Sequence, residues 1–257
     1  MNNILLRLFP VWVLVCTMMS CAKQSSPPGT ASLTLINAVP GSSPSLVTNF
    51  SNQEPISWYN GALKILYGTW NPTYQKGAYS GDQALTIYHY PDTGAHSTPL
   101  FNLTLHLQPG TIHTLFLTGT MSAPDTLFTT DQPPYHPPSD SSMGIRFVNL
   151  SPGSAPISVN ITGGAYGSEV SSLPYKGITD FISYSATADV SHYNFEIRDA
   201  ASGTLIGSLD VTGVNYPINS WSPNIRRYRN FTLALLGLPE DPSTLKIILI
   251  DNSTTTT

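Results

Sequence analysis

Few residues in this chain have types and spacings that could support catalysis. The 257 residues include 6 histidines, 15 acidic residues and 2 cysteines. The sequence contains no Gly-x-Ser-x-Gly nucleophile elbow, no His-Glu-x-x-His zinc motif, no phosphate-binding loop and no calcium-loop aspartate pattern. Asp180, Glu240 and Asp241 lie near predicted turns, whereas a glycosidase needs two carboxyl groups about 5–9.5 Å apart in a cleft. We therefore predict no enzymatic activity and no cofactor.

Two histidines flank a predicted hairpin. His106 and His113 could face each other across it and hold a metal ion. The alternative interpretation is a pair of half-exposed strand residues, which the absence of a carboxylate between them favours. We predict no metal site.

Two groups of aromatic residues are the candidate ligand-binding residues. The second half of the chain has a long segment with the residues Trp221, Arg226, Arg227, Tyr228 and Arg229. Arginine stacks on aromatic rings and binds carboxylate or phosphate with its planar fork, so this segment could hold an acidic glycan, a headgroup or a partner. In the first half, Trp58 and Trp70 bracket a predicted strand and could form a sugar-binding platform. A structural role, with the rings packed on the core, remains open for both groups.

The two cysteines, Cys16 and Cys21, lie near the N-terminus. An apolar stretch, 8–16, follows Arg7 and is far shorter than the roughly 20 residues that a spanning helix needs. The following sequence Met-Met-Ser-Cys, 18–21, resembles the lipobox of bacterial lipoproteins. That resemblance implies a signal peptide, 1–20, and an anchor of lipid on Cys21. An ordinary secretory signal cleaved elsewhere is the alternative.

The chain repeats a turn motif of the form Asn-x-x-Pro-Gly-Ser-x-Pro. It occurs at 37–44 and again at 149–156, each time between two strand-like runs. In this motif proline fixes one corner, glycine allows positive φ at the next, and asparagine and serine can bond the exposed backbone. We interpret it as a structural corner rather than a binding loop.

The repeat predicts two domains. We expect a flexible tether after the lipidated cysteine, 21–31, a first β-sandwich, 32–131, a Pro-rich semi-rigid linker, 132–143, a second β-sandwich, 144–251, and a disordered tail, 252–257.

Strands are indicated by alternation of apolar and polar residues. Leu103, Leu105 and Leu107 alternate with polar residues, and the run 145–150 alternates in the same way, so each is expected to have one packed and one wet face. A Pro-Gly break before 112–118 predicts a hairpin with 103–107. The predicted fold is all-β, with two tandem immunoglobulin-like antiparallel β-sandwich domains after a lipoprotein signal peptide.

The run IRFVNLSPGSAPISVNITG, 145–163, resembles the opening of the domain of unknown function 4397 family. The resemblance implies tandem β-sandwich units in an exported or lipid-anchored bacterial protein. It implies no particular activity.

Composition narrows the range of functions. Charged residues make up 10% of the chain and the net charge is −4, which argues against nucleic acid as a partner. We predict a lipid-anchored bacterial cell-envelope protein, on either face of the outer membrane, with a non-catalytic binding or structural role. Its expected partners are the membrane, through Cys21, and a glycan or another envelope protein. A glycan-binding accessory module is the alternative, and a hydrolase with no recognisable motif ranks last.

Overall fold

The chain folds into β-sheets, which confirms the predicted all-β sandwich fold. The computed structural model describes residues 29–50, 62–92, 96–217 and 224–253. These ranges contain 16 strands in four four-stranded sheets and one short 3-10 turn, η1, but no α-helix. None of the described segments is therefore a helix long and apolar enough to cross a bilayer.

The first half of the molecule consists of two sheets. Their strand orders are β4-β1-β7-β8 and β3-β2-β5-β6. The elements are β1 (Thr30–Asn37), β2 (Leu46–Asn49), β3 (Lys64–Ile65), η1 (Pro72–Tyr74), β4 (Gln75–Tyr79), β5 (Gly81–His89), β6 (Phe101–Leu107), β7 (Ile112–Gly119) and β8 (Pro124–Asp131).

The second half has the same topology. Its sheets have the orders β12-β9-β15-β16 and β11-β10-β13-β14, which are those of the first half with eight added to each strand number. The strands are β9 (Ser142–Leu150), β10 (Ile157–Ile161), β11 (Val170–Leu173), β12 (Ile182–Ser185), β13 (His192–Asp199), β14 (Leu205–Thr212), β15 (Asn230–Leu238) and β16 (Asp241–Asp251).

Each half has one parallel strand pair in otherwise antiparallel sheets. The first strand of each half, β1 or β9, runs parallel to β7 or β15 respectively. Such pairing requires the chain to cross between sheets before it returns, so these two pairs are the most non-local contacts of each sandwich.

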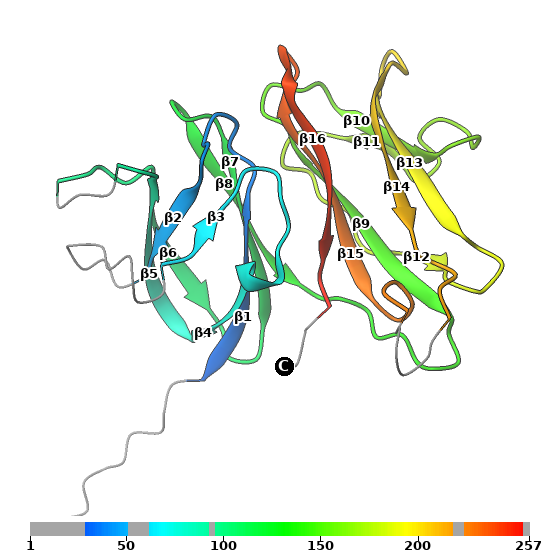
Figure 1. The fold of residues 1–257 in the computed structure, drawn as a ribbon, viewed down its shortest axis with the longest axis horizontal. Helices are drawn as coiled ribbons and strands as arrows, with labels where there is room; N and C mark the ends of the chain where they lie inside the picture. Colours follow the sequence, from blue (N-terminus) through cyan, green and yellow to red (C-terminus); the bar gives the residue numbers. More distant parts are fainter. Residues whose placement is uncertain (1–28, 51–61, 93–95, 218–223, 254–257) are drawn as a thin grey trace, which may run out of the picture.

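The four sheets stack as four layers (Figure 1). Within each half, the inner faces of the two sheets enclose an apolar core. A third apolar cluster joins the halves, because the sheet that contains β1 and β7 packs on the sheet that contains β9 and β15. Its buried members are Ile36, Ala38, Phe116, Val148, Leu150, Ala234, Leu236 and Ile250.

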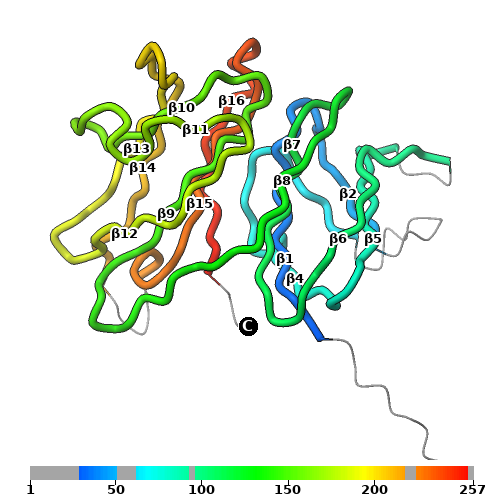
Figure 2. The backbone as a smooth tube through the Cα atoms, turned by 180° about the vertical axis from the view of Figure 1, so that it is seen from behind, coloured from blue at the N-terminus to red at the C-terminus, as the bar shows by residue number. Residues whose placement is uncertain are grey.

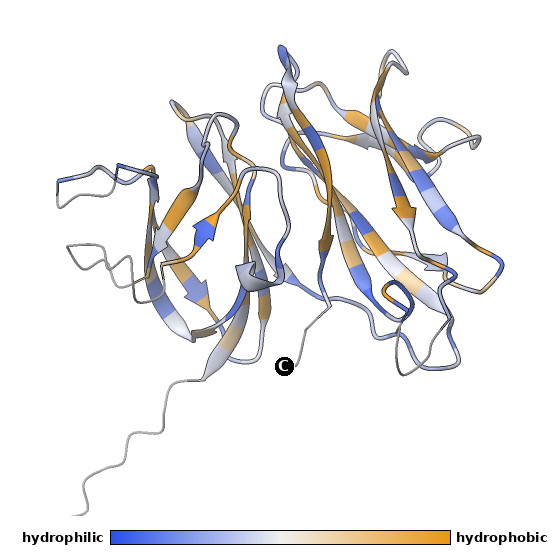
Figure 3. Cartoon of the chain, in the orientation of Figure 1, coloured by the Kyte–Doolittle hydropathy of each residue, from blue (hydrophilic) through white to orange (hydrophobic). Residues whose placement is uncertain are grey.

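This third cluster explains why the burial pattern of β9 differs from that of β6. In β6, Leu105 and Leu107 are buried and Thr104 and His106 are exposed, as the alternation predicts. Apolar and polar residues alternate along such strands in Figure 3. In β9 every residue is buried. The prediction of a wet face for 145–150 was therefore wrong, because Val148 and Leu150 on that face pack against the first half.

The predicted hairpin between 103–107 and 112–118 is also wrong. These segments form β6 and β7, which belong to different sheets. β6 pairs with β5, and β7 pairs with β1 and β8. The Pro-Gly break carries the chain from one layer of the sandwich to the other rather than back along a neighbour.

The repeated turn is a buried corner in both halves. The Asn37 side chain donates to Ser42 Oγ (2.9 Å) and to a β3 carbonyl (3.1 Å), and its oxygen accepts from a backbone amide. Asn149 makes the matching bonds, to Ser154 Oγ (3.0 Å), to a β11 carbonyl (3.2 Å) and from a backbone amide. Gly41 and Gly153 have φ of 79° and 77°. These contacts support the structural interpretation of the motif.

The Pro-rich segment between β8 and β9 lies against the second half. His136 is buried and its ring bonds Ser142 Oγ (2.9 Å) and Asn230 Oδ1 (3.0 Å), while Tyr228 donates to the Pro138 carbonyl. Figure 2 shows this segment running along one end of the second half. Its contacts hold it in place, so it is more than a spacer.

The predicted tail begins with ordered residues. Asn252 is buried and its Oδ1 accepts from Thr232 Oγ1 (2.6 Å), and the backbone amide of Ser253 donates to Asp251. The prediction of disorder from residue 252 is corrected by these contacts, which arise because Asn252 continues the pairing of β16 with β15. Residues 254–257 lie outside the described residues.

Candidate functional site

The candidate site is a polar cleft between the two halves. Its volume is about 550 Å³, within the range of ligand-binding pockets. The first half and the segment that follows it contribute Thr129, Thr130, Gln132 and Pro134, and the second half contributes Arg146, Ile178, Thr179, Asp180 and Phe181. The cleft is therefore built from segments far apart in the chain.

A buried ion pair supports the cleft. Arg146 Nη1 donates to Asp131 Oδ1 over 2.8 Å, and the two side chains are 6% and 1% exposed. Arg146 lies in β9 and Asp131 is the last residue of β8, so the pair joins the two halves. A pair this deeply buried stabilises only when further hydrogen bonds satisfy both groups.

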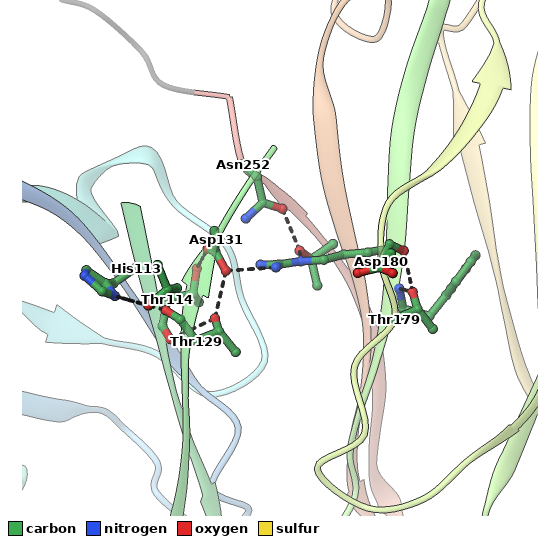
Figure 4. A network of polar contacts seen from close by, with 11 residues as sticks. His113, Thr114, Thr129, Asp131, Thr179, Asp180 and Asn252 are labelled. Atoms are coloured by element: carbon green, nitrogen blue, oxygen red, sulfur yellow. Dashed lines mark hydrogen bonds and ion pairs between the residues drawn. The ribbon is translucent and has the colours of Figure 1, made fainter. Parts of the chain in front are cut away.

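Most of those additional bonds are present. Asp131 also accepts from Thr114 Oγ1 (2.5 Å) and Thr129 Oγ1 (2.8 Å), as Figure 4 shows. Arg146 Nε donates to Thr232 Oγ1 over 2.8 Å. Both oxygens of Asp131 thus accept hydrogen bonds, from groups on β7, β8 and β9.

One amino group of the arginine is not satisfied. Arg146 Nη2 has no hydrogen-bond partner among the described residues, although its surroundings exclude solvent. The guanidinium carbon lies 4.8 Å from the centre of the Phe181 ring, which also lines the cleft. A buried N–H without a partner costs stability, so this arrangement has an unused donor beside the cleft.

The remaining lining groups are hydroxyls, an amide and a carboxylate. Thr179 Oγ1 donates to the Asp180 carbonyl (2.7 Å) and accepts from the backbone amide of Phe147 (3.0 Å), which fixes the segment before β12. The Asp180 carboxylate is exposed and has no bond or ion pair to any described residue. Figure 4 shows Asp180 and Thr179 together on the second-half side of the cleft.

Other polar contacts, outside the lining of the cleft, join the two halves. Lys176 Nζ lies 2.9 Å from Asp125 Oδ1, and Tyr175 also donates to Asp125. Partial burial opposes ionisation of Asp125, but the hydrogen bond and charge of Lys176 and the Thr126 amide outweigh it. The pKa of Asp125 is therefore held below its usual value.

A tyrosine makes a further bond between the halves. Tyr67 donates its hydroxyl to the backbone carbonyl of Thr244 in β16 over 2.6 Å. Burial, followed by the charge of Asp241, raises the pKa of Tyr67 to about 12.

The arginines predicted as ligand-binding residues are engaged within the fold. Arg226 donates to the Thr212 carbonyl (3.0 Å) and lies over the Phe231 ring, and Arg227 donates to the Ala186 carbonyl (2.6 Å). Arg229 forms an ion pair with Asp251 (3.1 Å). Tyr228 holds the Pro-rich segment. The structure keeps these residues together, but it does not bring them to the cleft.

The other predicted site residues lie elsewhere. Trp70 is half-buried, packs on the first core and on the cluster between the halves, and meets Tyr74 edge-on. Cys21, Trp58 and Trp221 lie outside the described residues.

The histidine pair is not assembled. His106 is exposed on β6 and contacts Asp82 (2.5 Å), whereas His113 is buried on β7 and stacks on Phe128. They lie in different sheets because the predicted hairpin does not form. The described residues hold no cluster of three or more potential metal ligands among His, Cys, Asp and Glu.

Sequence reasoning missed the residues that line the cleft. Arg146 gave a usable signal, because it is a charge within an apolar run whose two faces both carry large apolar residues. Asp131, Asp180 and Phe181 gave none, since their role depends on how the halves pack. A scan against protein-family models gives no match for this chain, and a search of curated proteins finds no similar sequence.

Proposed function

We propose that this protein is a non-catalytic binding protein that takes a neutral saccharide in the cleft between its two halves. The observation that carries the proposal is the composition of the cleft, in which hydroxyl, amide, carboxylate and guanidinium groups surround an aromatic ring. Sugar hydroxyls both donate and accept hydrogen bonds, so they need this mixture of partners, and a ring such as Phe181 offers the apolar contact that a sugar face needs.

The charges of the cleft favour a neutral ligand. The positive charge of Arg146 is balanced by Asp131, and Asp180 adds an uncompensated negative charge at the surface. An acidic glycan would meet this carboxylate, and among the described lining residues the one cation, Arg146, is already paired and cannot offset the repulsion.

Two features argue for binding rather than a purely structural junction. A buried ion pair is often no more stabilising than apolar residues of the same volume, so it adds little to simple adhesion of the halves. In addition, the exposed carboxylate of Asp180, which has no partner among the described residues, is an acceptor that a ligand could use.

The chemistry of the cleft also supports a non-catalytic role. A glycosidase needs two available carboxyl groups. Asp131 cannot act as an acid or nucleophile while Arg146, Thr114 and Thr129 occupy both its oxygens. That leaves Asp180 as the one free carboxylate among the lining residues.

The cellular setting that we infer rests on the sequence. The lipobox-like run before Cys21 supports a lipid-anchored cell-envelope protein at the outer membrane. The shared strand order and the matching asparagine corners support tandem copies of one unit of the kind found in the domain of unknown function 4397 family. Palmitate incorporation should be lost in Cys21→Ala, and incorporation that survives this change would refute the anchor.

The binding proposal is tested with an array of neutral glucan, mannan and galactan oligosaccharides and an acidic set, probed with the full chain. We expect a neutral oligosaccharide to bind. Asp180→Asn and Phe181→Ala should each weaken its binding about tenfold in calorimetry, because each removes one kind of contact that the sugar needs.

The matched control is Glu240→Gln, which removes the same charge from the exposed connection between β15 and β16. It should leave affinity unchanged. The proposal fails if no neutral oligosaccharide binds, if only acidic ones do, or if the two cleft variants bind as well as the control.

A further inference from the structure

The first half contains an apolar cavity within its sandwich. Its volume is about 480 Å³, and its floor includes Leu33 and Leu35, each 1% exposed. Phe50 and Ala78 add apolar walls, and polar groups at the rim complete the lining: Thr30, Lys76, Gly77, Tyr79 and Gln83. The cavity is lined by other residues than the cleft between the halves, and the inference below does not depend on the proposed function.

Comparison of equivalent positions in the two halves shows why the cavity exists. The strand pairing aligns Ala31 and its partner Ala78 with Met143 and its partner Tyr184. The constant spacing of the repeat places Leu35 opposite Phe147 in the same alignment. At each of these three positions the first half therefore has a smaller side chain than the second.

The facing sheet shows the same difference. β2 and β10 are equivalent strands. The first residue of β2, Leu46, pairs with His89 of β5, and the first residue of β10, Ile157, pairs with Asp199 of β13, so His89 and Asp199 are equivalent positions. Moving the same number of residues back from His89 along β5 and from Asp199 along β13 aligns Leu85 with Phe195 and then Gln83 with Tyr193.

The second-half residues at these positions fill its core with aromatic rings. Tyr184 meets Phe195 and Tyr193 edge-on at 5.3 Å, and Phe147 meets Phe195 at 5.4 Å. The first half has leucine, alanine, glutamine and leucine in place of these four aromatic residues. Protein interiors are normally close-packed, so a cavity of this size in the first sandwich requires an explanation.

The geometry points to a second binding site here, for a small molecule with an aromatic or alicyclic hydrocarbon body and one anionic group. The hydrocarbon body fills the volume that Phe147, Tyr184 and Tyr193 occupy in the other half. The anionic group meets Lys76, which is exposed at the rim and makes no ion pair with any described residue.

The site is tested with two fluorescent probes that share an aromatic body. 1-Anilinonaphthalene-8-sulfonate is anionic, and N-phenyl-1-naphthylamine is its neutral counterpart. The protein is the full chain carrying Cys21→Ser, so that detergent is not needed. One equivalent of either probe is expected to bind, with the higher affinity for the sulfonate.

Two variants separate the contributions of the cavity and the lysine. Leu35→Phe with Ala78→Tyr introduces the second half's residues and should weaken both probes about tenfold or more. Lys76→Gln should weaken the sulfonate about twofold to fivefold and leave the neutral probe unchanged. Ala201→Tyr makes the same alanine-to-tyrosine change at an exposed turn and should have no effect.

Circular dichroism checks that each variant folds, and Ala78→Leu alone replaces the double variant if that one does not. The inference is overturned if neither probe binds the folded chain or if filling the cavity leaves both affinities unchanged. It is also overturned if binding appears only in Trp58→Ala, because the chain would then fill its own cavity.

Discussion

At the scale of single residues, the fold depends on a few positions where only one side chain satisfies the backbone. Asn37 and Asn149 each bond three groups in a buried corner, and both corners use a glycine with positive φ. These residues were recognisable in the sequence because the physical demand is local. A turn that needs a particular φ and a particular hydrogen bond restricts residue types within a few positions.

Gly119, at the end of β7, must be glycine for two reasons, its φ of 79° and the lack of space for a Cβ atom. A Cβ there would lie 2.3 Å from the Ala123 carbonyl oxygen. Gly153 has nearly the same φ, 77°, but a Cβ would meet nothing within 4 Å. We therefore expect Gly119→Ala to lower the free energy of unfolding by about 3 kcal/mol and Gly153→Ala by about 1 kcal/mol, measured in urea. Equal losses in the two variants would show that the contact with Ala123 does not matter.

At the scale of strands and sheets, the sequence predicted which segments are strands better than it predicted what covers them. Alternation located β6 and β9, because the period of two is a property of the extended chain. It did not reveal that both faces of β9 are buried, although Val148 and Leu150 carried that information. It also gave a false hairpin between β6 and β7, since a turn signal does not say which sheet the next strand joins.

The buried pair of β9 and β8 gives a prediction at this scale. Arg146→Met leaves Asp131 buried without its cation and should cost about 3–5 kcal/mol of unfolding free energy. Adding Asp131→Asn removes the stranded charge, so the double variant should be more stable than Arg146→Met alone.

The matched control is the more exposed pair of Arg229 with Asp251, in which Arg229→Met should cost at most about 1 kcal/mol. Arg146 and Asp131 do not interact if the double variant Arg146→Met with Asp131→Asn loses as much unfolding free energy as its two single variants lose together.

At the scale of the whole molecule, the central finding is that two sandwiches share a third core. The cluster around Phe116 and Leu150, and the bonds of Asp131, Asp125 and Tyr67 to the second half, join them into one body. The cleft could not be predicted from the sequence, because none of its residues lines a pocket until the halves meet. The candidate residues that were predicted instead, such as Arg226 and Arg227, hold turns and backbone carbonyls.

The ion pair of Asp125 with Lys176 makes the junction sensitive to acid. Because the pKa of Asp125 is lowered in the folded chain, its contribution to stability is present above the unfolded value of 3.8 and is lost as pH falls through the folded value. Asp125→Asn should be less stable than the parent by up to about 1 kcal/mol at pH 7, and the difference should shrink as pH falls below 3.8 and disappear once pH is below the lowered pKa of the folded chain. Asp92→Asn, which alters an exposed loop, is the control for the pH profile of unfolding in urea. A difference that persists unchanged in acid would contradict the assignment.

The shared core is tested most directly by the distance between the two halves in solution. Spin labels at Thr104→Cys and Ser208→Cys, both exposed on the outer sheets, report this distance by pulsed electron paramagnetic resonance in a chain whose two native cysteines are replaced, Cys16→Ser and Cys21→Ser. Two halves that pack through Phe116 and Leu150 predict a single narrow distribution of distances. A broad distribution would mean that the sandwiches move independently, and neither the third core nor the cleft between them would then exist as described.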